Sequence, residues 1–297
     1  MATKQTKKDG FWDTLKTVFW ALVIAMVFRT TLYQPFSIPS GSMKPTLLVG
    51  DYLFVSKFAY GYSHYSLPFS PDWFEGRIWA EMPERGDVVV FKRPGQDACT
   101  QGPIAMVAGL VRSVTGGRGG APDDCVDYVK RVIGLPGDRI QVKGGILHIN
   151  GQALTTVRDG DFVEPKVLRG SPPGRPRCIN EPVPRGGACV KERWLETLPE
   201  GKVHSVLNID GIVGDTSAPH YSGPDNTPEF TVPEGHLFFM GDNRDNSVDS
   251  RFMRNRGIGM VPFENLIGRA EVIALSSDGA FWQLWNWRGD RFFNAID

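Results

Sequence analysis

The chain has 297 residues, and its 33 lysines and arginines are balanced by 33 aspartates and glutamates, so its formal net charge is zero. This balance argues against a nucleic-acid partner, which calls for a basic excess and a basic patch. The length suits one large domain or two smaller ones. The 34 glycines and 22 prolines, with few long helical periods after residue 35, predict a mainly β, loop-rich body.

The first predicted element is an apolar segment close to the N-terminus. Residues 17–28 are uncharged, but these 12 residues span only about 18 Å as a helix, less than the ~30 Å hydrocarbon layer. Residues 11–33 form a stretch that can cross the layer if Lys16 and Arg29 extend their charges to the two interfaces. We therefore predict a cytoplasmic N-terminus at residues 1–10 and a transmembrane anchor at residues 11–33, since lysine-rich flanks stay in the cytoplasm.

A cleaved secretory signal is the alternative interpretation of the same segment. Such a signal requires a small-x-small site soon after its apolar core. The residues that follow, 29–36 (RTTLYQPF), are mostly large and contain no Ala-x-Ala, so we favour an uncleaved anchor. Pro35 and Pro39 then end the helix and predict an extended segment, which keeps residues 40–46 near the membrane.

Short strands separated by turns are predicted downstream of the anchor. They are recognised by apolar alternation or by short apolar runs that end at glycine, proline or aspartate. The Asn150-Gly151 pair also marks the turn of a hairpin within residues 146–154. The predicted strands are residues 49–58, 87–92, 128–133, 237–240 and 266–274.

These strands predict an antiparallel β-sheet catalytic domain with an inserted second β subdomain. The catalytic domain is discontinuous, over residues 34–144 and 235–297, and the inserted subdomain covers residues 145–234. Residues 94–125 are interpreted as a loop of unknown function, closed by a cysteine near each end. The aromatic residues of 280–293 fit a bilayer interface or a cover over the β core equally well.

The four cysteines are Cys99, Cys125, Cys178 and Cys189, and none belongs to a CxxC pair. A zinc ribbon or a thioredoxin-like motif is therefore disfavoured. If the anchor carries the body out of the cytoplasm, disulfides are allowed. Of the three connectivities we favour 99–125 with 178–189, because each pair brackets a Gly/Pro-rich loop; four reduced, buried thiols are the alternative.

Residues 40–46 (SGSMKPT) place serine hydroxyls on a predicted tight bend. A serine hydroxyl is a poor nucleophile until a base takes its proton. The five histidines occupy positions more typical of surface or structural residues. The sequence also lacks Gly-x-Ser-x-Gly, Ser-x-x-Lys and His-Glu-x-x-His, so α/β-hydrolase, penicillin-binding and zinc-protease arrangements are disfavoured.

Lys130 is the remaining candidate base. It lies in a predicted strand among apolar neighbours, including Tyr128 and Val129. A lysine that points inward from such a strand loses hydration, which lowers its pKa and lets the neutral amine accept a proton. Taken alone, Lys130 beside Arg131 is more often a solvated basic pair.

Residues 241–251 (GDNRDNSVDSR) form a polar loop after a predicted strand. Its aspartates could bind Ca²⁺, but its two arginines argue against a metal. A salt-bridged scaffold fits better, with Asp249 and Arg251 holding the site and Ser247 orienting the lysine amine. We expect neither a metal nor another cofactor.

Taken together, these motifs resemble the type I signal peptidases, the bacterial leader peptidases. The likeness covers the anchor and four segments in the family's order. It departs from the best-known pattern in having one predicted transmembrane helix, a longer stretch at 94–125 and extra residues at 253–257. The four segments are residues 34–61, 85–91, 127–138 and 241–251, with GRA at 268–270.

The resemblance implies a role for each matched position. Ser42 matches the nucleophile and Lys130 the general base. Ser40 matches the hydroxyl of an oxyanion hole that also uses the Ser42 backbone N–H. The supporting positions match Ser247, Asp249 and Arg251, and the substrate pockets match Phe36, Ile38, Met43, Leu47, Leu53, Tyr128 and Val129.

The implied function is a membrane-bound serine endopeptidase that removes N-terminal signal peptides after small-x-small (Ala-x-Ala) sites. Its expected partners are signal-peptide-bearing precursor proteins and the phospholipid bilayer, and it is expected to be a monomer without nucleic acid. The implied location is the bacterial inner membrane, single-pass, with the catalytic domain on the periplasmic side. The alternative is a non-catalytic, membrane-anchored envelope scaffold, against which the presence of both Ser42 and Lys130 argues.

Overall fold

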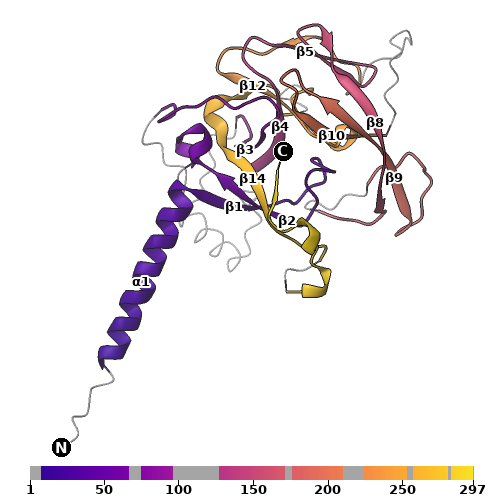
Figure 1. Ribbon diagram of the computed structural model, residues 1–297. Coiled ribbons are helices and arrows are strands. Elements are labelled where there is room, and N and C mark those ends of the chain that lie inside the picture. The colour runs from indigo at the N-terminus through magenta and orange to yellow at the C-terminus, as the bar shows by residue number, and fades with distance from the viewer. Residues whose placement is uncertain are drawn as a thin grey trace, which may run out of the picture.

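The computed structural model describes residues 8–66, 75–95, 127–170, 176–209, 224–252, 257–279 and 282–296. Its one α-helix among them, α1 (Lys8–Thr31), projects from a β body (Figure 1). Within it, Gly10–Thr31 is long and apolar enough to cross a membrane, and none of it is buried against the rest of the chain. The helix ends two residues before the predicted boundary, because Tyr33 already pairs with Ser56 in a sheet.

The largest sheet is antiparallel and holds the segments whose motifs carry the candidate site. Its order is β1-β2-β14-β3-β4-β12-β13, with β15 paired to β14. Every strand predicted for the catalytic domain is present in it, shifted by a few residues at its ends. The strands are β1 (Tyr33–Ser37), β2 (Asp51–Ser56), β3 (Val88–Lys92), β4 (Asp127–Gly134), β12 (His236–Met240), β13 (Val261–Pro262), β14 (Leu266–Ser276) and β15 (Asn294–Ala295).

Two smaller antiparallel sheets contain the strands between β4 and β12. One has the order β11-β5-β6-β7 and the other β10-β9-β8. The β5–β6 hairpin lies across the predicted boundary at residue 144, so the first small sheet uses residues from both sides of it; the domain division stays a prediction. The strands are β5 (Arg139–Lys143), β6 (Ile146–Ile149), β7 (Gln152–Ala153), β8 (Thr155–Pro165), β9 (Ala188–Thr197), β10 (Val203–Asn208) and β11 (Phe230–Thr231).

Local chemistry explains several of these elements. All five residues of β3 are buried, as expected for an apolar run in the middle of a sheet. The predicted hairpin turn is also present: Asn150 and Gly151 have φ angles of 54° and 81°, and these two residue types accept the left-handed region most readily. Six short 3₁₀ helices lie in the described connections between strands. They are η1 (Phe58–Tyr60), η2 (His64–Ser66), η3 (Arg244–Asn246), η4 (Phe263–Asn265), η5 (Leu284–Asn286) and η6 (Gly289–Arg291).

The core divides into three apolar clusters that follow the sheets. One lies between β5, β6 and β12, and the other two cover the two faces of the large sheet. At the C-terminal end, Trp282, Trp285 and Phe293 are 77%, 80% and 75% exposed. These three rings therefore do not cover the β core, which was one of the two interpretations of residues 280–293.

Candidate active site

The candidate nucleophile lies on a bend between β1 and β2. We call this bend, residues 40–46, the catalytic loop. Two residues of the polar loop after β12 hold it in place. The backbone N–H of Asn243 donates to the Ser42 carbonyl at 3.0 Å, and its side-chain amide donates to the Gly41 carbonyl at 2.8 Å. Thr46 Oγ1 donates to Asp242 Oδ2 at 2.5 Å. The bend predicted from small residues is thus fixed by contacts far away in the sequence.

Lys130 and Ser42 are in direct contact. Lys130 Nζ donates a hydrogen bond to Ser42 Oγ, and the two residues are 3% and 8% exposed. Lys130 lies on β4 opposite Val89, among the apolar strands of the large sheet. Burial lowers the pKa of Lys130 to about 8, although Asp249 and Asp242 oppose the shift. The prediction of an inward, dehydrated lysine therefore describes the residue better than the solvated basic pair.

Ser40 lies at the rim of the same site. Its Oγ is 3.4 Å from Ser42 Oγ, and the residue is exposed. A hydroxyl in this position can turn toward an oxygen that develops negative charge beside Ser42.

Asp249 and Arg251 form a fully buried ion pair behind the site. Arg251 Nε is 2.9 Å from Asp249 Oδ1, and its Nη2 donates to Oδ2 at 3.0 Å. The Gly241 N–H also donates to Asp249, at 3.0 Å. Burial by itself would raise the pKa of Asp249, but Arg251 and the Gly241 amide hold it below its ordinary value. The pair thereby ties both ends of the polar loop together.

Ser247 is placed close to the site, but its predicted bond to the lysine amine is not formed. Within the described part of the chain, its buried Oγ bonds neither Lys130 nor Ser42, and Ser247 instead helps to lower the pKa of Asp249. The hydroxyl lies against Gly241, where an added Cβ would be only 2.3 Å from it. The amine of Lys130 bonds Ser42 instead.

A second buried ion pair lies beneath the catalytic loop and was not predicted from the sequence. Arg131 donates to both carboxylate oxygens of Asp242, at 2.9 and 2.8 Å, and also to the Gly86 carbonyl at 2.7 Å. Arg131 follows Lys130 and so points to the other side of β4. The apparent basic pair in the sequence is therefore split between two buried environments.

The site opens into a cleft of about 480 Å³. Of the residues matched to substrate pockets, Ile38, Met43, Tyr128 and Val129 line this cleft. Leu47 and Leu53 are fully buried and pack in the core behind the lining, in the same cluster as Phe36. The cleft is also lined by residues of the β10-β9-β8 sheet, which we call the smaller sheet, and of its loops, including Glu164, Val167, Pro176 and Lys191.

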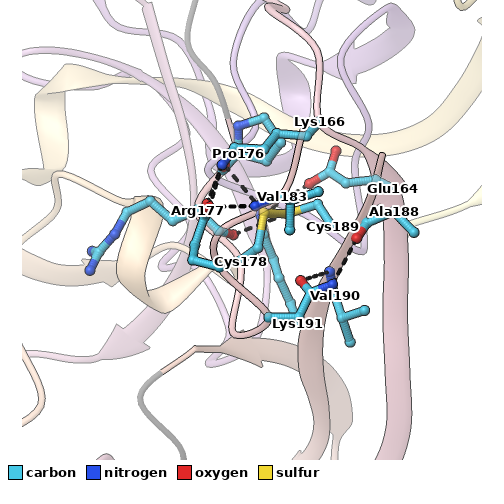
Figure 2. Close-up of a disulfide and its surroundings, with 12 residues drawn as sticks. Glu164, Lys166, Pro176, Arg177, Cys178, Val183, Ala188, Cys189, Val190 and Lys191 are labelled. Carbon is cyan, nitrogen blue, oxygen red and sulfur yellow. Dashed lines mark hydrogen bonds and ion pairs between the residues drawn. A yellow bond between two sulfur atoms is a disulfide. The ribbon is translucent and has the colours of Figure 1, made fainter. Parts of the chain in front are cut away.

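The lining also includes charged groups that the sequence did not single out. Lys44 and Lys191 both contact the buried carboxylate of Glu164. Beside them lies a disulfide between Cys178 and Cys189, the pairing favoured for these two cysteines (Figure 2). Cys99, Cys125 and most of the 94–125 stretch lie outside the described residues. Nothing in the spacing of Lys44, Glu164 and Lys191 signals that they meet.

The described residues contain no group of three or more His, Cys, Asp or Glu side chains that could hold a metal ion.

A serine hydroxyl in contact with a buried amine on a β scaffold is an arrangement from which serine hydrolases are built. Comparisons with known proteins define the class further. The family described as signal peptidase, peptidase S26, matches residues 11–275. Signal peptidase I of Rickettsia typhi is 36% identical over 94% of this chain and 84% of its own length. That of Rickettsia prowazekii is 35% identical over 89% of this chain and 80% of its own length.

Among solved structures, a signal peptidase I from Enterococcus faecalis is 19% identical, covers 64% of this chain and 97% of its own, and has a TM-score of 0.25. The chain is a serine endopeptidase. It belongs to the signal peptidase family, peptidase S26. This confirms the family that the sequence motifs resembled.

Proposed function

We propose that this chain is a membrane-anchored signal peptidase that cleaves after small-x-small sites, with Ser42 as nucleophile and Lys130 as general base. The observation that carries the proposal is the contact between Lys130 Nζ and Ser42 Oγ in a buried setting. Because the pKa of Lys130 is lowered to about 8, about a tenth of its amine is neutral at pH 7, far more than for an ordinary lysine.

The steps follow from these positions. Ser42 Oγ attacks the scissile carbonyl carbon while its proton moves to Lys130 Nζ, and the Ser40 hydroxyl with the Ser42 N–H stabilises the oxyanion. The tetrahedral intermediate collapses, the C–N bond breaks, and the Lys130 ammonium gives its proton to the leaving amine. Water then gives a proton to the neutral lysine and attacks the acyl-enzyme ester. The bond between the acyl carbon and Ser42 Oγ breaks, and the Lys130 ammonium returns its proton to Ser42 Oγ.

The lining of the cleft supports a preference for small residues. The lining includes the apolar side chains of Ile38, Met43 and Val129. A shallow apolar pocket accepts a methyl group and rejects larger side chains by steric clash. Residues 127–130 of β4 pair with β3, whereas pairing with β12 begins at Arg131. A substrate segment can therefore be added as a strand along this free edge, next to Ser42.

The anchor supports a site close to the bilayer. Helix α1 ends at Thr31 and β1 begins at Tyr33, so the catalytic body follows the apolar helix directly. With the lysine-rich end in the cytoplasm, the body lies on the periplasmic side of the inner membrane. Labelling of residue 9 or residue 200 after substitution by cysteine, with an impermeant reagent on whole spheroplasts, tests this orientation; labelling at 9 alone would contradict it.

Cleavage of a purified precursor tests the reaction. We expect Ser42→Ala and Lys130→Ala each to lose about 10⁴-fold or more in kcat, because nucleophile and base act as a unit. Lys143→Ala, in the half-buried strand β5, is the control and should cleave normally. Circular dichroism checks that all variants fold. Normal turnover by Lys130→Ala would reject the dyad, and failure of the wild type to cleave any precursor would reject the function.

A further inference from the structure

Two lysines share one buried carboxylate next to the catalytic loop. Glu164 comes from β8 and Lys191 from β9, and Lys191 Nζ is 3.0 Å from Glu164 Oε1. Lys44 Nζ donates to the other oxygen, Oε2. The side chains of Lys44, Glu164 and Lys191 are only 9%, 9% and 3% exposed. The group is therefore largely dehydrated and carries an excess of one positive charge when both amines are protonated.

The contact between Lys44 and Glu164 joins parts of the chain that are 120 residues apart. Lys44 is the second residue after Ser42, whereas Glu164 belongs to the smaller sheet. The stem of Lys44 lies over the backbone that carries the two serines, since Cε of Lys44 is 3.2 Å from the position of a Cβ on Gly41. Displacement of the Lys44 side chain would thus remove one of the contacts on the backbone between Ser40 and Ser42, which Asn243 holds from the other side.

The Glu164 end of this connection is braced. Glu164 lies opposite Cys189 in the β8–β9 register, and Cys189 is cross-linked to Cys178. Figure 2 shows Glu164 and Lys191 close to this disulfide. Lys44 is therefore held by a carboxylate on a cross-linked hairpin, a more fixed partner than a surface side chain.

Stability alone gives a weak reason for three charged groups at this place. Dehydration of buried ion pairs costs much of what their attraction returns, and well-packed apolar residues often stabilise a protein equally well. What charges add is a defined geometry, because the short contacts form in only one arrangement of the two segments. This geometry matters most on the Lys44 side, because Ser42, the proposed nucleophile, lies only two residues before Lys44.

We infer that Lys44, Glu164 and Lys191 form a positioning triad that holds the catalytic loop against the smaller sheet and so keeps Ser42 Oγ within reach of Lys130. The inference rests on the proposed roles of Ser42 and Lys130. In it, Glu164 and Lys44 are positioning residues, and they touch neither the scissile carbonyl nor the leaving amine.

Two matched substitutions test the triad. Lys44→Met and Lys191→Met each remove one buried amine and leave Glu164 paired with the other lysine, so their effects on charge are alike. Only Lys44→Met breaks the bond between the catalytic loop and Glu164, while the contacts of the loop with Asn243 and Asp242 remain in both variants. We expect it to lower kcat about 10- to 100-fold with KM changed less than threefold, the loss typical of a misplaced reacting group. The fold loss in kcat should be at least ten times smaller in Lys191→Met than in Lys44→Met. Lys44→Arg should keep most of the wild-type kcat.

Three results of these assays would overturn the inference. Equal losses in Lys44→Met and Lys191→Met would show a role in charge balance only. Unchanged kcat with raised KM in Lys44→Met would show a substrate contact instead. Wild-type kinetics in both variants would show no role. Glu164→Gln leaves two buried amines without a carboxylate and is expected to fold poorly, so the two lysine variants decide the question.

A measurement without substrate separates this inference from the proposed function. Backbone hydrogen exchange of residues 40–46 should be faster in Lys44→Met than in the wild type or Lys191→Met, with the rest of the large sheet unchanged. Equal exchange in all three proteins would reject the tether, even if the wild type cleaves precursors. If the wild type cleaves none, the proposed function fails, while the exchange rates still decide whether Lys44 holds the loop.

Discussion

The two regions that flank Ser42 both contain buried lysines, but they use them differently. On one side, Lys130 faces the serine, and its nearest carboxylates are committed to arginines: Asp249 to Arg251 and Asp242 to Arg131. On the other side, Lys191 is equally buried but directly paired with Glu164.

Burial lowers the pKa of both amines, and at Lys191 the paired carboxylate opposes the shift at close range. The comparison teaches that burial alone does not make a lysine a base. What differs is the direct contact: Lys191 is ion-paired with Glu164, whereas among the described residues Lys130 has no ion pair and contacts the Ser42 hydroxyl.

The same substitution at both regions gives the largest expected contrast. An arginine keeps the positive charge but cannot give up its proton near neutral pH. Lys130→Arg should therefore lose kcat by about 10³-fold or more, whereas Lys44→Arg should keep most of it. The measurement is kcat on one purified precursor, with thermal unfolding as the control for folding. Substantial turnover by Lys130→Arg would break the distinction between the two regions.

Loss of the ion pair behind Lys130 should destabilise the protein strongly. Asp249→Asn leaves the buried Arg251 without its countercharge, which costs about 3–5 kcal/mol of unfolding free energy. The control is Glu229→Gln, which removes an exposed pair with Arg139 at 3.7 Å and should cost less than about 1 kcal/mol. Denaturant unfolding measures both values. Equal stabilities would mean that the polar loop does not depend on this pair.

Removal of the disulfide tests how rigid the Glu164 region has to be. The cysteines are 11 residues apart in sequence, and for a closed loop of this size the loss is about 3 kcal/mol. We expect Cys178→Ser with Cys189→Ser to unfold at lower temperature, and to show faster hydrogen exchange in β8 and β9 than in β4. Exchange that rises equally in all three strands would argue against a local brace.

The pH dependence of activity should report the Lys130 region alone. Since the pKa of Lys130 is lowered to about 8, kcat/KM should fall about tenfold per pH unit below that value, as the amine gains a proton. The Cys178→Ser/Cys189→Ser variant should keep the same inflection. A flat profile between pH 5 and 8 in the wild type would point to another base.

The same pKa shift has a consequence for stability. The ordinary pKa of a lysine is 10.5, and in the folded protein the pKa of Lys130 is about 8. Between these values the unfolded chain binds more protons than the folded one, so the contribution of Lys130 to stability rises with pH and is lost as pH falls through 8. Unfolding of the wild type and Lys130→Met at pH 7 and 9.5 measures it. If the unfolding free energy changed equally between the two pH values in both proteins, that would contradict the lowered pKa of Lys130.

Much of the fold could be predicted because its signals are local. Apolar runs and turn residues marked the strands at 87–92, 128–133 and 266–274, and Asn150-Gly151 marked a hairpin. The long strands β8 and β9 were not predicted, since their exposed residues dilute the alternation. The position of Ser42 on a bend was likewise readable from small, turn-forming neighbours.

What the sequence alone determined is which groups are present, in what order, and where short-range propensities bend or extend the chain. The tertiary structure decided which side chains meet. It directed Lys130 to Ser42 and Arg131 to Asp242, although the two basic residues are adjacent, and it brought Lys44 to Glu164 across 120 residues. The physical reason is that dehydration and ion pairing depend on neighbours supplied by other strands, and no local pattern specifies those neighbours.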